Sequence, residues 1–267
     1  MLFMHRCKFR AASLIGLLVV CLALCSGLGL IQVRAEVTRL APTPTPTPAF
    51  VPGMNSVGAS NDMYLVFVPN RGQLEGRIFF SIQAGAQKML FSKQGITYRL
   101  IGMNGSHWNL KLEYQDQNTN VRPIGVQMAP ITVSVYIGRF DRWLPYVPTF
   151  ARIVYRNLWD DIDLFYSGEN NRLNYRYVIQ PYADPDEIYL AYRGASLVEV
   201  TSDGQLAVQT PGGDLLDRSP IAWQDIGGFR FPVTVSYEVY THRGDVWYFY
   251  FDVGAYNPAY ILYIASS

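Results

Sequence analysis

The residues of this chain that could carry chemistry are a short run of carboxylates, and the run can be interpreted in two ways. In an extended strand, Asp161 and Asp163 would project to the same face. There, with Asp160, they could hold a hard cation such as calcium or act as an acid and base pair. The plainer interpretation is a turn after Trp159, with side chains that accept hydrogen bonds from nearby backbone amides. We keep Asp160, Asp161 and Asp163 as a candidate calcium site and predict no other cofactor.

The histidines do not complete a catalytic set. Apart from His5 near the start, the chain contains only His107 and His242, each flanked by residues typical of turns. Two histidines exclude a His-rich zinc site, and a Ser-His-Asp triad would need one of them. Neither lies in a nucleophile-elbow context such as Gly-x-Ser-x-Gly. No catalytic residue is assigned, and the sequence favours a protein that is not an enzyme.

Aromatic residues are the other type that could bind a ligand. Trp143, Trp159 and Trp223 each stand beside a Pro, Asp or Gln that signals a loop, and exposed rings of this kind stack on the faces of sugars. These three residues are the candidate ligand-binding platform. The run from Trp247 to Phe251 places aromatic side chains on both sides of a strand. A strand buried on both faces is the plainer explanation for that run.

The first 35 residues have the pattern of an export signal. A basic segment that ends at Arg10 precedes an uncharged run, Ala11 to Ile31, which is long enough to cross a bilayer core as a helix. Residues 1–35 are therefore a signal peptide that is cleaved off, or a signal anchor that stays in the membrane. Both alternatives place residues 36–267 outside the cell or on its surface.

Cysteine content and charge limit the partners of the exported part. All three cysteines lie in the leader, so the remainder can form neither disulfides nor thiolate metal sites. Of the 22 Lys and Arg residues, four lie in the leader, which leaves 18 against 21 Asp and Glu. A nucleic-acid surface needs concentrated Lys and Arg, so we predict no nucleic-acid partner. A cell-envelope polysaccharide and a surface protein stay open as partners, with a membrane contacted only through an uncleaved N-terminal segment.

Residues 36–62 form a linker, and residues 63–267 form a domain of strands. The strict alternation of Pro and Thr from Pro42 to Pro48 predicts an extended spacer. Beyond the linker the hydrophobic period is two, as between Trp108 and Tyr114 and again at Leu173, Tyr175, Tyr177 and Ile179, which predicts half-buried strands. Turns that contain Gly separate such runs. No segment shows a convincing helical stripe. We expect one all-β domain of about fifteen strands with an antiparallel β-sandwich-like fold.

Several short blocks of this domain follow one another in the order found in a known family. The blocks are Phe67–Gln73, Val147–Pro148, Val154–Trp159, Ile162–Tyr166, Leu173–Tyr175, Ala183–Pro185, Ile188–Leu190 and Gly194–Ala195, then the turns at Gly204 and Gly212–Gly213, and Pro220. In these blocks the chain resembles an uncharacterised bacterial extracellular domain that precedes seven-bladed beta-propeller (SBBP) repeats. The resemblance implies an extracellular β module and supplies no catalytic residues. Family members usually continue into propeller repeats, whereas this sequence stops shortly after Ile264, so the resemblance does not imply a role as the base of a propeller.

Three functions remain open at this point. The leading one is a non-catalytic secreted or cell-surface β module with a structural, adhesive or assembly role. The alternatives are a carbohydrate-binding module and a carboxylate-dependent glycan hydrolase. Exposed aromatic rows without converging acids would favour carbohydrate binding, whereas two carboxyl groups about 5 to 10 Å apart in a groove would favour hydrolysis.

Overall fold

The computed structural model describes residues 65–85, 87–102, 105–169 and 171–266. The predicted leader and linker, residues 1–62, lie outside the described residues. Within the described part, no helix has the length and apolar character needed to cross a membrane. These residues form strands joined by turns, so the prediction of an all-β fold is confirmed.

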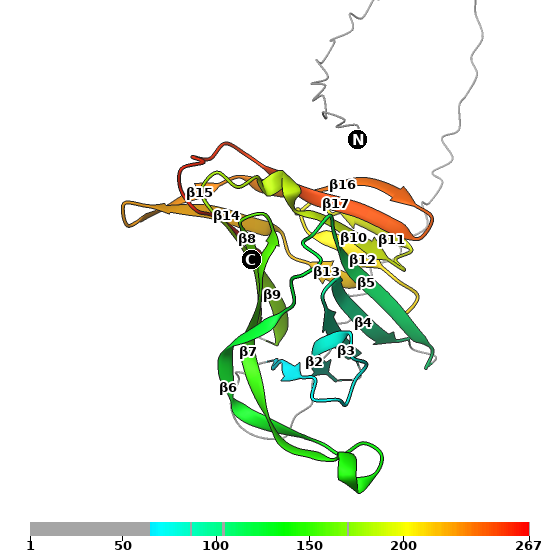
Figure 1. Ribbon diagram of the computed structural model, residues 1–267. Helices are drawn as coiled ribbons and strands as arrows, with labels where there is room; N and C mark the ends of the chain where they lie inside the picture. The colour runs from blue at the N-terminus through cyan, green and yellow to red at the C-terminus, as the bar shows by residue number, and fades with distance from the viewer. Residues whose placement is uncertain (1–64, 86, 103–104, 170, 267) are drawn as a thin grey trace, which may run out of the picture. The chain divides into compact units, whose positions relative to one another are not determined.

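Two large antiparallel sheets make up most of the domain (Figure 1). The eight-stranded sheet has the order β1 (Val68–Pro69), β2 (Ile78–Ala84), β3 (Gln87–Ser92), β4 (Gly95–Ile101), β5 (His107–Gln115), β10 (Tyr189–Arg193), β17 (Val246–Val253) and β16 (Val235–Arg243). The seven-stranded sheet has the order β15 (Phe229–Val233), β14 (Pro220–Ile226), β18 (Leu262–Ser266), β9 (Arg172–Ile179), β8 (Ile162–Glu169), β7 (Leu144–Trp159) and β6 (Ile124–Val135).

A third, three-stranded sheet completes the core. Its strands, in order, are β11 (Leu197–Val200), β12 (Leu206–Gln209) and β13 (Leu215–Asp217). The turn before β13 packs closely on the eight-stranded sheet. The distance shows this: a Cβ added at Gly212 would lie only 2.8 Å from the Cβ of Trp108. This contact holds β13 against the core. Two single-turn 3₁₀ helices, η1 (Phe140–Arg142) and η2 (Pro185–Glu187), lie in connections.

The two large sheets pack through inner faces that are rich in tyrosine. Tyr155 is fully buried and lies edge-on to Tyr114, with ring centroids 5.4 Å apart. The buried hydroxyl groups are paired, since Tyr155 donates to the carbonyl oxygen of Ser92 at 2.8 Å and Tyr114 donates to Tyr166 at 3.1 Å. Each of these two bonds joins a strand of one large sheet to a strand of the other.

The strand of consecutive aromatic residues, β17, is buried on one face only. Phe249 and Phe251 point into the core and are almost fully buried. On the opposite face Tyr248 is half-buried and stacks on Tyr189 of β10, with ring centroids 5.6 Å apart. The expectation of burial on both faces is therefore wrong for the outer face, where the cover is a neighbouring ring of the same sheet.

We predict that Gly95→Ala destabilises the protein much more than Gly72→Ala. Both glycines have positive φ, +143° and +105°, so both substitutions strain the backbone. At Gly95 the added Cβ would also lie 1.9 Å from the carbonyl oxygen of Leu112 in β5, whereas at Gly72 it would meet no atom within 4 Å. In urea unfolding we expect losses of about 1–2 kcal/mol for Gly72→Ala and more than about 3 kcal/mol for Gly95→Ala. Equal losses would contradict the close approach of β4 to β5.

Candidate functional site

The aspartates predicted as a calcium site lie at the connection between β7 and β8. Asp160 and Asp161 form a turn, in which Asp161 has a φ of +56°. Asp163 is already engaged, because its carboxylate accepts a hydrogen bond from the backbone N–H of Asn157 at 2.8 Å and pairs with Arg156 at 3.3 Å. Among the described residues, no group of three or more potential metal-ligating side chains occurs. The predicted turn is therefore present, and the carboxylate that accepts from a backbone amide is that of Asp163, while calcium binding stays a prediction.

The three tryptophans predicted as a platform lie in three different environments. Trp143 is 40% exposed and packs against Tyr136 and Phe140 at the tip of the β6–β7 hairpin. Trp159 is buried in the core, so its ring is not available at the surface. Trp223 is half-buried on the outer face of the seven-stranded sheet. The fold does not bring these three rings together into one platform.

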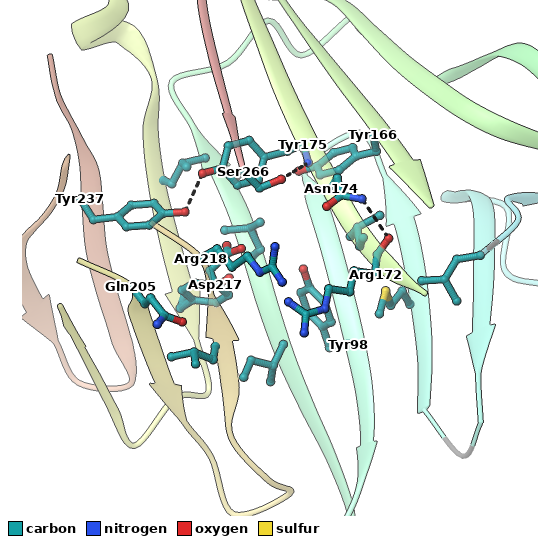
Figure 2. A pocket seen from close by; sticks show the side chains of 18 of the residues that line it. Tyr98, Tyr166, Arg172, Asn174, Tyr175, Gln205, Asp217, Arg218, Tyr237 and Ser266 are labelled. Carbon is teal, nitrogen blue, oxygen red and sulfur yellow. Dashed lines mark hydrogen bonds between the residues drawn. The ribbon is translucent and has the colours of Figure 1, made fainter. Parts of the chain in front are cut away.

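A cavity of about 510 Å³ lies between the inner faces of the two large sheets and beside the three-stranded sheet (Figure 2). Six tyrosines contribute to its wall, three from each large sheet. All of them except Tyr175 are at most 8% exposed, so the wall belongs to the core of the domain. The six are Tyr98 on β4, Tyr192 on β10, Tyr237 on β16, Tyr166 on β8, and Tyr175 and Tyr177 on β9.

Asp217 places a carboxylate against this tyrosine wall. It is the last residue of β13, and it is half-buried because its side chain faces the cavity. Among the described residues its side chain has no hydrogen-bond or ion-pair partner. Burial raises the pKa of Asp217 from its ordinary value of 3.8 to about 7. A carboxylate that is both desolvated and unpaired in a cavity is a candidate ligand-binding group.

The pKa values of phenol groups around the cavity are raised above the ordinary value for tyrosine. Burial is the main cause that raises their pKa values, and the negative charge of Asp217 raises them further. Two of the hydroxyl groups, those of Tyr175 and Tyr237, lie 2.6 Å apart and share a hydrogen bond across the two large sheets. The tyrosines with a pKa raised by Asp217 are Tyr98, Tyr175, Tyr177, Tyr192 and Tyr237.

The second carboxylate in the lining, Asp214, is placed differently. It lies in the turn before β13, is exposed, and accepts a hydrogen bond from the backbone N–H of Thr210 at 3.2 Å. A glycosidase-type pair needs two carboxyl groups that flank the same bond of the substrate. Because Asp214 is engaged with its own turn, the arrangement around Asp217 suits binding better than catalysis by paired carboxylates.

The sequence pattern does not reveal this cavity. It marks Tyr175 and Tyr177 as residues of a half-buried strand, which is correct, but alternation alone does not show which residues of other strands face them. Asp217 belongs to no motif. One signal could have identified it, because Asp217 shares the inward face of β13 with Leu215 while Leu216 between them is exposed. A charged residue at an inward position of a strand requires an explanation.

Comparison with known proteins supplies a family and no function. A family model described as a domain of unknown function (DUF7948) matches residues 67–265. The match includes Asp217 and the six tyrosines of the cavity wall. Neither a curated protein nor a solved structure matches the chain.

We predict that the free energy of unfolding falls as the pH rises from about 4 to about 8, because of Asp217. The carboxyl group has its ordinary pKa of 3.8 in the unfolded chain and a pKa of about 7 in the folded one, so the folded protein binds the proton more tightly. The stability due to this group is full below about pH 4 and is lost as the pH rises through 7. Asp217→Asn cannot ionise and should gain at least about 1 kcal/mol relative to the wild type across this range in urea unfolding.

Asp214→Asn is the matched control for this measurement. Asp214 precedes the same short strand but is exposed and hydrogen-bonded, so its variant should follow the wild type at every pH. If the stability difference between wild type and Asp217→Asn is independent of pH, the carboxylate of Asp217 is solvated and the description of the cavity is wrong.

Proposed function

The chain belongs to the DUF7948 family of domains of unknown function, and we propose that it is an exported, non-catalytic module that binds a saccharide in the cavity around Asp217. The observation that carries the proposal is a tyrosine-lined cavity whose half-buried carboxylate has no partner among the described residues. The leader predicted for residues 1–35 supports export. In this role the module is adhesive, and it attaches the protein to a polysaccharide of the cell envelope.

A saccharide matches both kinds of surface that the cavity offers. The apolar faces of a sugar ring can lie on the phenol rings of the wall, while its hydroxyl groups can donate to Asp217 and bond with Asn174 and Gln205. The volume of about 510 Å³ falls within the range of about 300–1,000 Å³ that is common for small-ligand sites. A wholly apolar ligand would leave Asp217 unpaired in a desolvated site, which is unfavourable.

A glycan screen with the full chain tests this proposal. We expect binding to at least one polysaccharide or oligosaccharide, measured by an array and then by titration calorimetry. Asp217→Asn should weaken that binding about tenfold or more, because a charge-assisted hydrogen bond becomes a neutral one. If the wild-type chain binds no glycan, the proposal fails.

Trp143→Ala is the control for the location of the site. Trp143 lies at the hairpin tip with other exposed aromatic residues and does not line the cavity. Its variant should bind as the wild type does. Loss of binding in Trp143→Ala, combined with normal binding in Asp217→Asn, would move the site to the hairpin tip and contradict the cavity assignment.

A further inference from the structure

A groove on the seven-stranded sheet gathers positive charge. It has a volume of about 620 Å³, and its lining residues on β7, β8, β9, β18 and β14 come mainly from the outer face of that sheet. Four arginines line it, and Glu169 is the acidic residue among the described lining. Glu169 pairs with one of the four, Arg152, at 2.9 Å. The four arginines are Arg152, Arg172, Arg176 and Arg218.

This charge is a local property and does not follow from the composition. The chain after residue 35 has slightly more acidic than basic residues, 21 against 18, four of the 22 Lys and Arg lying in the leader. Within the described residues, neither Arg172 nor Arg176 forms an ion pair with an acidic side chain. Among the described residues, the charges of Arg172 and Arg176 are therefore not neutralised by an ion pair, and such a site attracts anions.

Two donors in the same groove lack acceptors. The Nε–H group of Arg176 and the indole N–H group of Trp223 are both buried, and neither has a hydrogen-bond partner among the described residues. Arg176 lies over the ring of Phe165, at 5.7 Å from the centroid, and Arg230 lies over the ring of Trp223 at 4.6 Å. These contacts hold the flat groups in place but accept no hydrogen bond from either N–H group. Buried donors in proteins are almost always paired, so these two N–H groups lack acceptors that the described residues do not supply and that a ligand could.

The groove and the tyrosine-lined cavity meet at a shared border. Arg172 and Asn174 are among the residues that line both, and Figure 2 shows them beside the cavity with Arg218 and Ser266. A ligand long enough to enter the cavity could therefore continue into the groove. The residues common to both are Arg172, Asn174, Tyr175, Arg218 and Ser266.

We propose that this groove binds an acidic substituent, a carboxylate, sulfate or phosphate group, of the glycan whose sugar ring occupies the cavity. The oxygens of such a group accept from the Nε–H of Arg176 and the indole N–H of Trp223, and Arg172 adds charge at the border with the cavity. The inference that the ligand is an anionic glycan rests on the proposed saccharide-binding function and makes its ligand class more specific. The anion site itself rests on the groove alone.

Matched pairs of oligosaccharides test this assignment with the full chain. Uronic-acid, sulfated and phosphorylated oligosaccharides are each titrated beside a neutral counterpart, which is the carboxyl-reduced, desulfated or dephosphorylated form. At least one acidic member should bind about tenfold or more tightly than its neutral counterpart, and added salt should reduce this preference. Equal affinities within all three pairs would overturn the proposal.

Three substitutions locate the preference. Arg176→Gln and Arg172→Gln should each reduce the preference for the acidic member at least about threefold, while binding of the neutral member is unchanged. Arg172 is exposed, so its variant should fold as the wild type does, and it covers the case in which Arg176→Gln unfolds. Arg156→Gln is the control, because Arg156 lies on β7 of the same sheet, pairs with Asp163 and does not line the groove. A preference that survives both groove variants would overturn the proposal.

Inorganic sulfate separates the failure of this inference from the failure of the proposed function. The indole N–H signal of Trp223, assigned by Trp223→Phe, should shift in nitrogen–proton NMR spectra when sulfate is added to the full chain. If sulfate shifts the signal but no glycan binds, the anion site stands and the saccharide function falls. If neutral glycans bind and neither sulfate nor an acidic glycan engages Trp223, the saccharide function stands and the anion site falls. Arg176-dependent binding of acidic peptides or anionic vesicles in place of glycans would overturn the assignment to a glycan.

Discussion

The two large sheets are joined by tyrosine hydroxyl groups that need hydrogen-bond partners inside the core. Tyr114 bonds to Tyr166 and Tyr175 to Tyr237, each pair connecting one large sheet to the other. These phenol pairs therefore connect the two sheets across the core, and the tyrosine-lined cavity lies between the same inner faces.

Asp217 contributes a carboxylate to the lining of the cavity. The paired tyrosines satisfy one another, whereas β13 delivers a carboxylate that has no partner among the described residues. A partly desolvated carboxylate without a partner lowers stability, and an apolar residue at this position would pack without that penalty. The position makes physical sense if a ligand provides the missing donors. The groove beside Arg172 presents the complementary case, because the N–H donors of Arg176 and Trp223 have no acceptor in the part of the chain that the structure describes.

The fold could be predicted from the sequence more fully than the site could. Alternation within each segment, such as that around Tyr175 and Tyr177, identifies strands and their inward faces because the side-chain period of a strand is two. The pairing of β5 with β10 and of β14 with β18 joins segments far apart in the chain, and no local pattern encodes it. The cavity depends on those distant pairings.

The predicted site residues also show that a local sequence pattern does not reveal contacts between distant segments. The aspartates around Asp161 were recognisable as a turn because turn chemistry is local. The exposure of a tryptophan is not local: Trp159 also stands beside this turn, yet it is buried against Tyr114 of the opposite sheet, with ring centroids 5.9 Å apart. Trp223 does line a groove, but its neighbours there, such as Arg176, come from another strand.

The central claim is that the tyrosine-lined cavity partly desolvates the carboxylate of Asp217, which has no partner among the described residues. Its most direct test is a pH titration of the side-chain carboxyl carbon of Asp217 by NMR on the full chain labelled with carbon-13 aspartate, with the signal assigned by Asp217→Asn. The account predicts an apparent pKa of about 7. A pKa near the ordinary value of 3.8 would show a solvated or paired carboxylate and would contradict it.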